Sequence, residues 1–74
     1  MITLVVGNTY GRQTELVTGN ETIRELLTTY NVGFDGTITI DGVPVFPDEF
    51  DMRLNEFEIG QKVFLMSIIK SNNN

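Results

Sequence analysis

Residues 22–30 read TIRELLTTY and contain the clearest helix signal in this sequence of 74 residues. Thr22 and Glu25 have the spacing of a capping box, in which each side chain accepts a hydrogen bond from the backbone amide of the other residue. The apolar side chains recur at the spacing that gathers them on one helical face: Ile23, Leu26, Leu27 and Tyr30. Asn31 and Gly33 supply the C-terminal stop, and Gly33 is expected to adopt the positive φ. A helix this short needs a sheet against its apolar face.

The segments around this helix have the alternation and β-branched content of strands. Five strands are expected, at residues 2–6, 12–18, 37–40, 43–46 and 62–70. Residues 7–11 form a turn between the first two strands, and Asp41-Gly42 is a type I′ hairpin signal between the third and fourth. Pro44 marks the fourth strand as an edge. The inward register of the second strand stays open, because Leu16 and Val17 point to opposite faces.

Residues 48–57 have no strand pattern and are expected to wrap the sheet edge, with a turn of helix near residues 53–56. The apolar residues of this crossover are expected to fill the core: Phe50, Met52, Leu54 and Phe57. The order of elements predicts an α+β fold, with one helix on one face of a mixed sheet of four or five strands. No linker is visible, so residues 1–70 are expected to form a single domain followed by a disordered tail at 71–74.

This order resembles the ubiquitin-like β-grasp superfamily, and most closely its small bacterial sulfur carriers of thiamine and molybdopterin synthesis. The residues that carry the resemblance are Thr22-Ile23, the helical stripe, Asp41-Gly42, Leu54-Asn55 and Ile59-Gly60. In carriers and conjugating members, the last strand leads to a C-terminal Gly-Gly whose carboxylate is adenylated. This sequence ends Lys70-Ser71-Asn72-Asn73-Asn74, with no glycine after Gly60. The resemblance therefore implies the scaffold without the reactive end, and it supplies no catalytic residue.

Composition argues against several classes of function. The sequence contains no cysteine and no histidine, so thiolate metal sites, cysteine nucleophiles and histidine general bases are excluded. The net charge of −5 disfavours binding to nucleic acid. No apolar run approaches the ~20 residues of a membrane span, and no signal peptide is visible. A soluble, cytoplasmic, non-enzymatic protein without metal or cofactor is expected.

The last strand is the strongest indication of a binding surface. Phe64, Met66 and Ile68 alternate with Val63, Leu65 and Ser67, and the helix covers one face of the sheet. The first set is expected to form an exposed apolar stripe for a protein partner, extended by Ile40 or Val43. A shift of one residue would expose Val63, Leu65 and Ile69 instead. Alternatively, the crossover covers this face, or the apolar residues are scattered surface positions.

A second candidate is the acidic cluster formed by Asp48, Glu49, Asp51, Glu56 and Glu58. Its spacing does not match a calcium-binding loop, and apolar residues interleave with the acids, so a solvated charged loop is favoured over a cation site, an acid–base site or a basic partner's docking surface. Residues 7–11 are read as a hairpin turn in which Tyr10 is a candidate contact residue.

The sequence thus predicts a ubiquitin-like protein-interaction module that binds through the helix-free sheet face, either to a second copy or to another protein. The alternatives are a sulfur-carrier or conjugation protein, which the missing Gly-Gly disfavours, and a small viral or mobile-element inhibitor.

Overall fold

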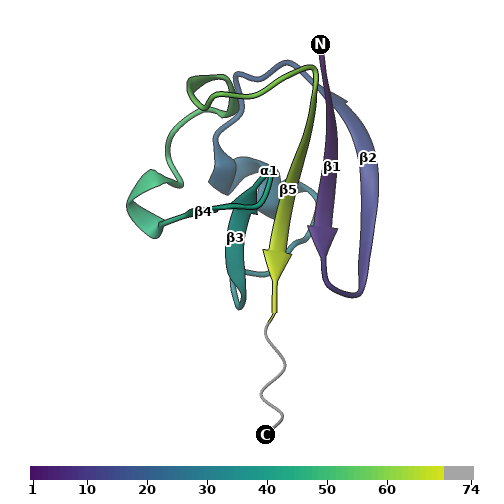
Figure 1. Ribbon diagram of the computed structural model, residues 1–74, viewed down its shortest axis with the longest axis vertical. Coiled ribbons are helices and arrows are strands. Elements are labelled where there is room, and N and C mark those ends of the chain that lie inside the picture. Colours follow the sequence, from purple (N-terminus) through teal and green to yellow (C-terminus); the bar gives the residue numbers. More distant parts are fainter. Residues whose placement is uncertain (70–74) are drawn as a thin grey trace, which may run out of the picture.

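The computed structural model describes residues 1–69 and shows an α+β domain with one helix and one five-stranded sheet. The elements in chain order are β1 Ile2–Asn8, β2 Gly11–Val17, α1 Ile23–Thr29, β3 Thr37–Ile40, β4 Val43–Val45, the 3-10 turns η1 Pro47–Glu49 and η2 Leu54–Glu56, and β5 Lys62–Ile68. The strands stand in the order β2-β1-β5-β3-β4 (Figure 1). β1 and β5 run parallel, and the other pairs are antiparallel. The α+β class and the mixed sheet are therefore confirmed.

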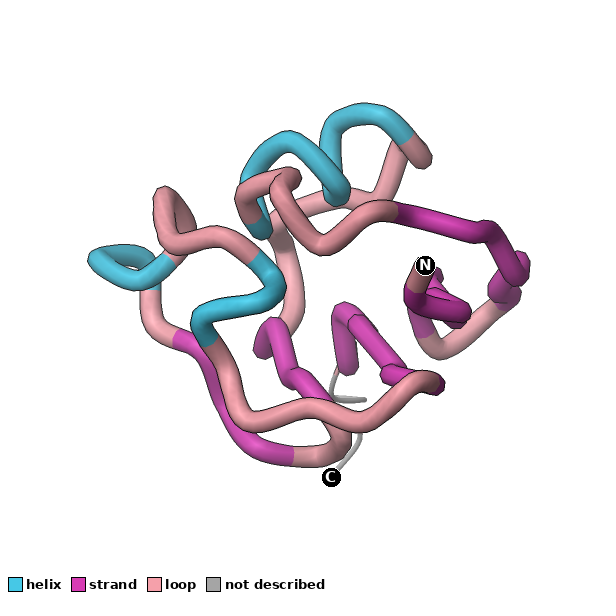
Figure 2. The backbone as a smooth tube through the Cα atoms, turned by 90° about the horizontal axis from the view of Figure 1, so that it is seen from above, coloured by secondary structure: helices cyan, strands magenta, loops and turns pink. Residues whose placement is uncertain are grey.

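The helical segments and the sheet form two layers around the core. α1 lies behind the sheet in Figure 1, and Figure 2 shows the strands curving around one side of the molecule with the helical segments on the other. Side chains from α1, the crossover and the sheet share one buried cluster, which includes Leu27, Leu54 and Leu65. No helix within residues 1–69 is long and apolar enough to cross a membrane. The expected tail at 71–74, together with Lys70, lies outside the described residues.

The hairpin between β1 and β2 is tighter than the sequence pattern indicated. Asn8 pairs directly with Gly11, so the loop contains two residues and not the five expected. The Asn8 carboxamide oxygen accepts hydrogen bonds from the amides of Tyr10 (2.9 Å) and Gly11 (3.2 Å). This side chain thus accepts two hydrogen bonds inside the hairpin and stabilises the short loop.

The capping box of α1 is confirmed. The Glu25 amide donates to Thr22 Oγ1 (3.1 Å), and the Thr22 amide donates to Glu25 Oε1 (2.8 Å). The C-terminal stop differs from the expectation, because Asn31 and not Gly33 has the positive φ, at 58°. Asn31 directly follows the C-cap Tyr30, where helices commonly place a left-handed residue, and asparagine tolerates that conformation better than most side chains.

The turn between β3 and β4 has the expected geometry and an additional role. Asp41 (φ 51°) and Gly42 (φ 86°) both have positive φ, as a type I′ turn requires. The Asp41 amide donates to the Phe64 carbonyl (2.8 Å), and its carboxylate accepts from the Phe64 amide (2.9 Å). Asp41 therefore continues the pairing of β5 beyond the end of β3, and it fixes the backbone from which the Phe64 side chain projects.

The crossover fills the core from the helix side of the sheet. Leu54 and Phe50 are buried and Phe57 packs against the cluster, as expected, whereas Met52 is half-buried and lies outside it. The carbonyls of Met52 and Phe50 accept from the Ile23 amide (3.1 Å) and the Arg24 amide (2.9 Å). The crossover thus satisfies two first-turn amides of α1 that have no partner within the helix. It does not run over the opposite face of the sheet.

The Glu21 carboxylate accepts several hydrogen bonds within the segment that connects β2 to α1. It accepts from the Gly19 amide (2.9 Å), the Thr18 hydroxyl (3.1 Å) and the Thr18 amide (3.4 Å). Burial alone would raise the pKa of Glu21, but these hydrogen bonds and one from its own amide outweigh burial and hold the pKa below the ordinary value of 4.5.

The lowered pKa predicts how stability depends on pH. A carboxyl that is more acidic when folded contributes stability fully above its unfolded pKa of 4.5, and this contribution is lost as pH falls through the folded pKa. Glu21→Gln should therefore destabilise the domain at neutral pH, and the difference from wild type should shrink below about pH 4.5. Urea unfolding at several pH values measures this, with the exposed Glu58→Gln as the control. A difference that stays constant down to pH 3 would contradict the assignment.

Candidate protein-binding face

The side chains of β5 alternate between the core and the helix-free side of the sheet. Val63, Leu65 and Ser67 are buried toward the helix layer. On the other side, Phe64 is 36% exposed, Ile68 is 42% exposed and Met66 is half-buried. The register of the last strand is therefore the one that places Phe64, Met66 and Ile68 away from the helix.

The neighbouring strands extend this surface, because directly paired residues project on the same face of a sheet. Phe64 pairs with Val5, and Met66 pairs with Gly7 on one side and Thr39 on the other. Leu16 on β2 pairs with Thr3, which is itself paired with Lys62. We use "outer face" for the strand residues on this side: Thr3, Val5, Gly7, Arg12, Thr14, Leu16, Thr37, Thr39, Pro44, Lys62, Phe64, Met66 and Ile68.

The outer face carries its own small apolar cluster. Val5 is 6% exposed although it is not part of the core, so neighbouring side chains on the outer face must cover it. Leu16 is 64% exposed on the outermost strand. We call Val5, Leu16, Phe64, Met66 and Ile68 the outer patch. Val5 and Leu16 were not predicted to belong to this surface. For Leu16, the strand pattern did not decide which of Leu16 and Val17 points inward. For Val5, the available signal was its alternation with Leu4 and Val6, which are core.

Two residues expected to extend the stripe lie elsewhere. Ile40 pairs with Leu65 and is buried in the core. Val43 pairs with Ile40, so it belongs to the helix side of the sheet, where it is exposed at the edge. The extension through Ile40 or Val43 is therefore wrong. The alternation of Thr37-Ile38-Thr39-Ile40 was the available signal, since Ile38 and Ile40 share one face and Ile38 is also core.

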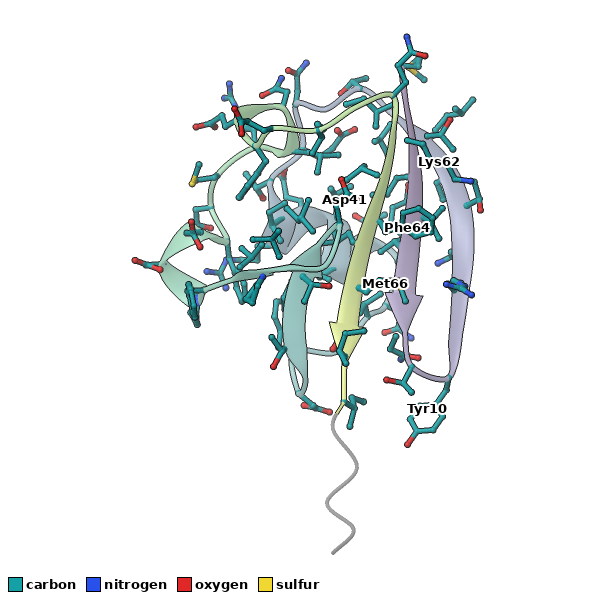
Figure 3. All side chains as sticks on the ribbon, viewed as in Figure 1. Tyr10, Asp41, Lys62, Phe64 and Met66 are labelled. Carbon is teal, nitrogen blue, oxygen red and sulfur yellow. The ribbon has the colours of Figure 1, made fainter. Side chains whose placement is uncertain are left out.

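The charges on the outer face are positive, although the protein is acidic overall. Lys62 and Arg12 both occupy outer-face positions, and the Lys62 ammonium lies 5.5 Å from the centre of the Phe64 ring. Among the described strands β1 to β5, no outer-face position carries a carboxylate. Asp41 lies beside Phe64 in Figure 3, where its carboxylate accepts from the Phe64 amide.

A shallow groove adjoins the outer patch at its Ile68 end. Its volume is about 410 Å³, and its walls include Tyr10 and Arg12 from the hairpin and Met66 and Ile68 from β5. Tyr10 is exposed at the hairpin tip (Figure 3). The Ile69 amide donates to Thr9 Oγ1 (3.1 Å), which holds the end of β5 beside the hairpin. The groove is thus formed by two segments that are joined directly.

The acidic crossover is explained largely by local structure. Glu49 accepts from the Phe46 amide and Glu56 from the Arg53 amide, both at 2.9 Å. Asp51 pairs with Arg24 (2.9 Å), which lowers the pKa of Asp51 and raises that of Arg24. Within residues 1–69 no group of acidic side chains is arranged to hold a metal ion. The solvated-loop interpretation is the one that the geometry favours.

A second groove, of about 380 Å³, lies on the helix side at the β4 edge. Val43, Val45 and Phe57 form its apolar wall, and Glu49, Glu56 and Glu58 are also part of its lining. Three carboxylates thus line a groove on the helix side, whereas Arg12 and Lys62 occupy positions on the outer face. In comparisons of this chain with protein families, curated proteins and solved structures, no significant match was found.

Proposed function

We propose that this protein is a non-enzymatic interaction module with a ubiquitin-like β-grasp fold. The supporting features of the fold are the chain order of the elements and the sheet order β2-β1-β5-β3-β4, in which the first and last strands are central and parallel. The family resemblance in the sequence leads to the same proposal. The module acts by binding, and its site is the outer patch.

The observation that carries this proposal is the unpartnered outer patch in the middle of the sheet. Phe64 stands on the central strand, in contact range of the Lys62 ammonium, and Val5 of the same patch is almost fully covered. Contiguous apolar residues with a polar rim are typical of protein-binding surfaces, and aromatic residues with nearby cations often dominate the binding energy. Phe64 is paired in register with Val5 of β1, and its amide and carbonyl both hydrogen-bond to Asp41, so the site is preorganised.

The charges indicate the chemistry of the partner. Arg12 and Lys62 stand near opposite ends of the outer face, and no outer-face carboxylate in the described strands opposes them. A partner that presents an apolar ridge with carboxylates on its flanks would complement this surface. The rim charges should mainly affect the association rate and its dependence on salt, whereas Phe64 should mainly affect the dissociation rate.

The test compares two Phe→Thr substitutions. Phe64→Thr removes the central ring of the patch and keeps a residue suited to a strand, whereas Phe46→Thr removes an exposed ring beyond the end of β4, the edge strand farthest from β2. Proteins are captured from a lysate of the source cells on immobilised wild type and both variants, and the captured partner is then titrated with each. We expect Phe64→Thr to weaken binding by about tenfold or more and Phe46→Thr to leave it within about twofold.

Amide shifts of the labelled protein show where the partner binds. With the purified partner, shifts should concentrate at Thr3, Phe64 and Met66. No captured partner, equal binding by Phe64→Thr and wild type, or shifts confined to the helix side would each overturn the proposal.

A further inference from the structure

The sheet has two edges, and they differ in how well they are protected. β4 has three residues, with Pro44 in the middle, and proline blocks the addition of another strand. β2 has seven residues without proline, and all but Val17 are at least partly exposed. Figure 1 shows β2 at the outside of the sheet, and none of the helices or strands described within residues 1–69 lies beyond it. The edge of β2 is therefore open along its length.

Side chains accept hydrogen bonds from backbone amides at both ends of this edge, but they do not do so in its middle. Asn8 accepts from the amides of Tyr10 and Gly11, and Glu21 accepts from those of Thr18 and Gly19. Between these ends, no side chain within the described part of the chain hydrogen-bonds to the backbone of residues 12–17. The Gln13 side chain, which could do so, instead donates to the Tyr30 carbonyl (3.4 Å).

The hairpin register tells which backbone groups point outward. In a two-residue hairpin, the amide and carbonyl groups of the closing pair, here Asn8 and Gly11, point toward each other between the two strands. Along the strands, pairs that are hydrogen-bonded in this way alternate with pairs whose amides and carbonyls point away from the partner strand. Counting from this pair, Gln13 and Glu15 direct their amides toward β1. Arg12, Thr14 and Leu16 direct theirs away from the sheet, where a further strand could pair with them.

We propose that β2 pairs with β2 of a second copy of this chain, antiparallel, about a two-fold axis at Thr14. Thr14 is the midpoint of Gly11–Val17, so this register gives the longest overlap. The two Thr14 residues face each other, Gln13 faces Glu15, and Arg12 faces Leu16. The paired assembly is one ten-stranded sheet with both outer faces on the same side.

The chemistry of these pairs is self-complementary. No like charges face each other, Gln13 can donate to the Glu15 carboxylate, and the Thr14 pair is of a kind that stabilises antiparallel strands. Leu16, which is 64% exposed in the single chain, would be covered by the aliphatic part of the second copy's Arg12. The edge shares Leu16 and Arg12 with the outer face, but its pairing uses the backbone of β2 and does not involve Phe64 on β5, so the inference does not rest on the proposed function.

The experiment measures molar mass by light scattering over a concentration series for wild type and three variants. Thr14→Pro removes the outward amide without removing a donor to β1, and Thr14→Val keeps the amide as the matched control. Phe64→Thr alters the outer patch and not the edge. We expect wild type, Thr14→Val and Phe64→Thr to approach the mass of two chains, and Thr14→Pro to stay at the mass of one.

Several outcomes overturn the inference. They are a wild type that stays at the mass of one chain at every concentration, a folded Thr14→Pro that still dimerises, and a dimer that only Phe64→Thr dissociates. If Thr14→Pro does not fold, amide hydrogen exchange of the wild type decides the question. The amides of Arg12, Thr14 and Leu16 should exchange more slowly as concentration rises, and unchanged exchange rates would reject the edge pairing.

Discussion

Replacing Leu54 with alanine is expected to lower the free energy of unfolding by about 2–5 kcal/mol, the largest effect that we predict for a single substitution. Leu54 is fully buried and belongs to the cluster shared by α1, the crossover and the sheet. Its amide donates to the Glu21 carbonyl (2.9 Å), and the next amide, of Asn55, donates to the Gly19 carbonyl (3.0 Å). These bonds hold η2 in place, so the structure cannot easily collapse into the space left by the missing side chain.

This loss should be a large part of the total free energy of unfolding, because domains of this kind are stable by only about 5–15 kcal/mol. Urea unfolding followed by circular dichroism measures it, with Met52→Ala as the control in the same segment. Met52 is half-buried and outside the core cluster, so we expect a loss below about 1 kcal/mol. Equal losses for both variants would mean that the crossover does not fill the core as the structure shows.

The second large effect is expected at Gly7, where the backbone of β2 leaves no room for a side chain on β1. A Cβ atom at Gly7 would lie 2.5 Å from Arg12 Cα and would also overlap the Gly11 carbonyl oxygen. Both contacts are with backbone, which cannot swing aside as a long side chain can. Gly7→Ala should therefore push the two strands apart and cost about 1–3 kcal/mol, in the range of overpacked sites.

Gly11→Ala is the matched control, in the same hairpin and paired with Asn8. A Cβ there meets nothing within 4 Å, and Gly11 is not among the residues with positive φ. We expect this variant to be neutral or more stable by up to about 1 kcal/mol, because alanine restricts the unfolded chain. Thermal unfolding of both variants checks the difference. Similar melting temperatures would contradict the close approach of β1 and β2 at Gly7.

Much of the fold could be predicted from short-range patterns. The capping box of Thr22 and Glu25, the helical stripe and the Asp41-Gly42 turn are each specified within a few residues of chain. The errors there are small and have local causes. Asn31 adopts the left-handed conformation that was expected of Gly33, and the Asn8 side chain shortens the first turn.

The candidate site was predicted only in part. The alternation along β5 correctly separated Phe64 and Met66 from Val63 and Leu65. Val5 and Leu16 were missed, and Ile40 was placed on the wrong face. A strand pattern shows which residues share a face, but the identity of that face depends on the strands that pair beside it and on their register.

The sequence by itself therefore determined the helix, the turns and the alternation of each strand, because each of these depends on the backbone geometry of a few consecutive residues. The tertiary structure alone decided that Leu16 and Val5 join Phe64, that the two strand cations share the outer face, and that β2 has an open edge. Those properties follow from pairing between segments that are far apart in sequence, such as β1 with β5. Such pairing is settled by packing over the whole domain, which no local pattern records.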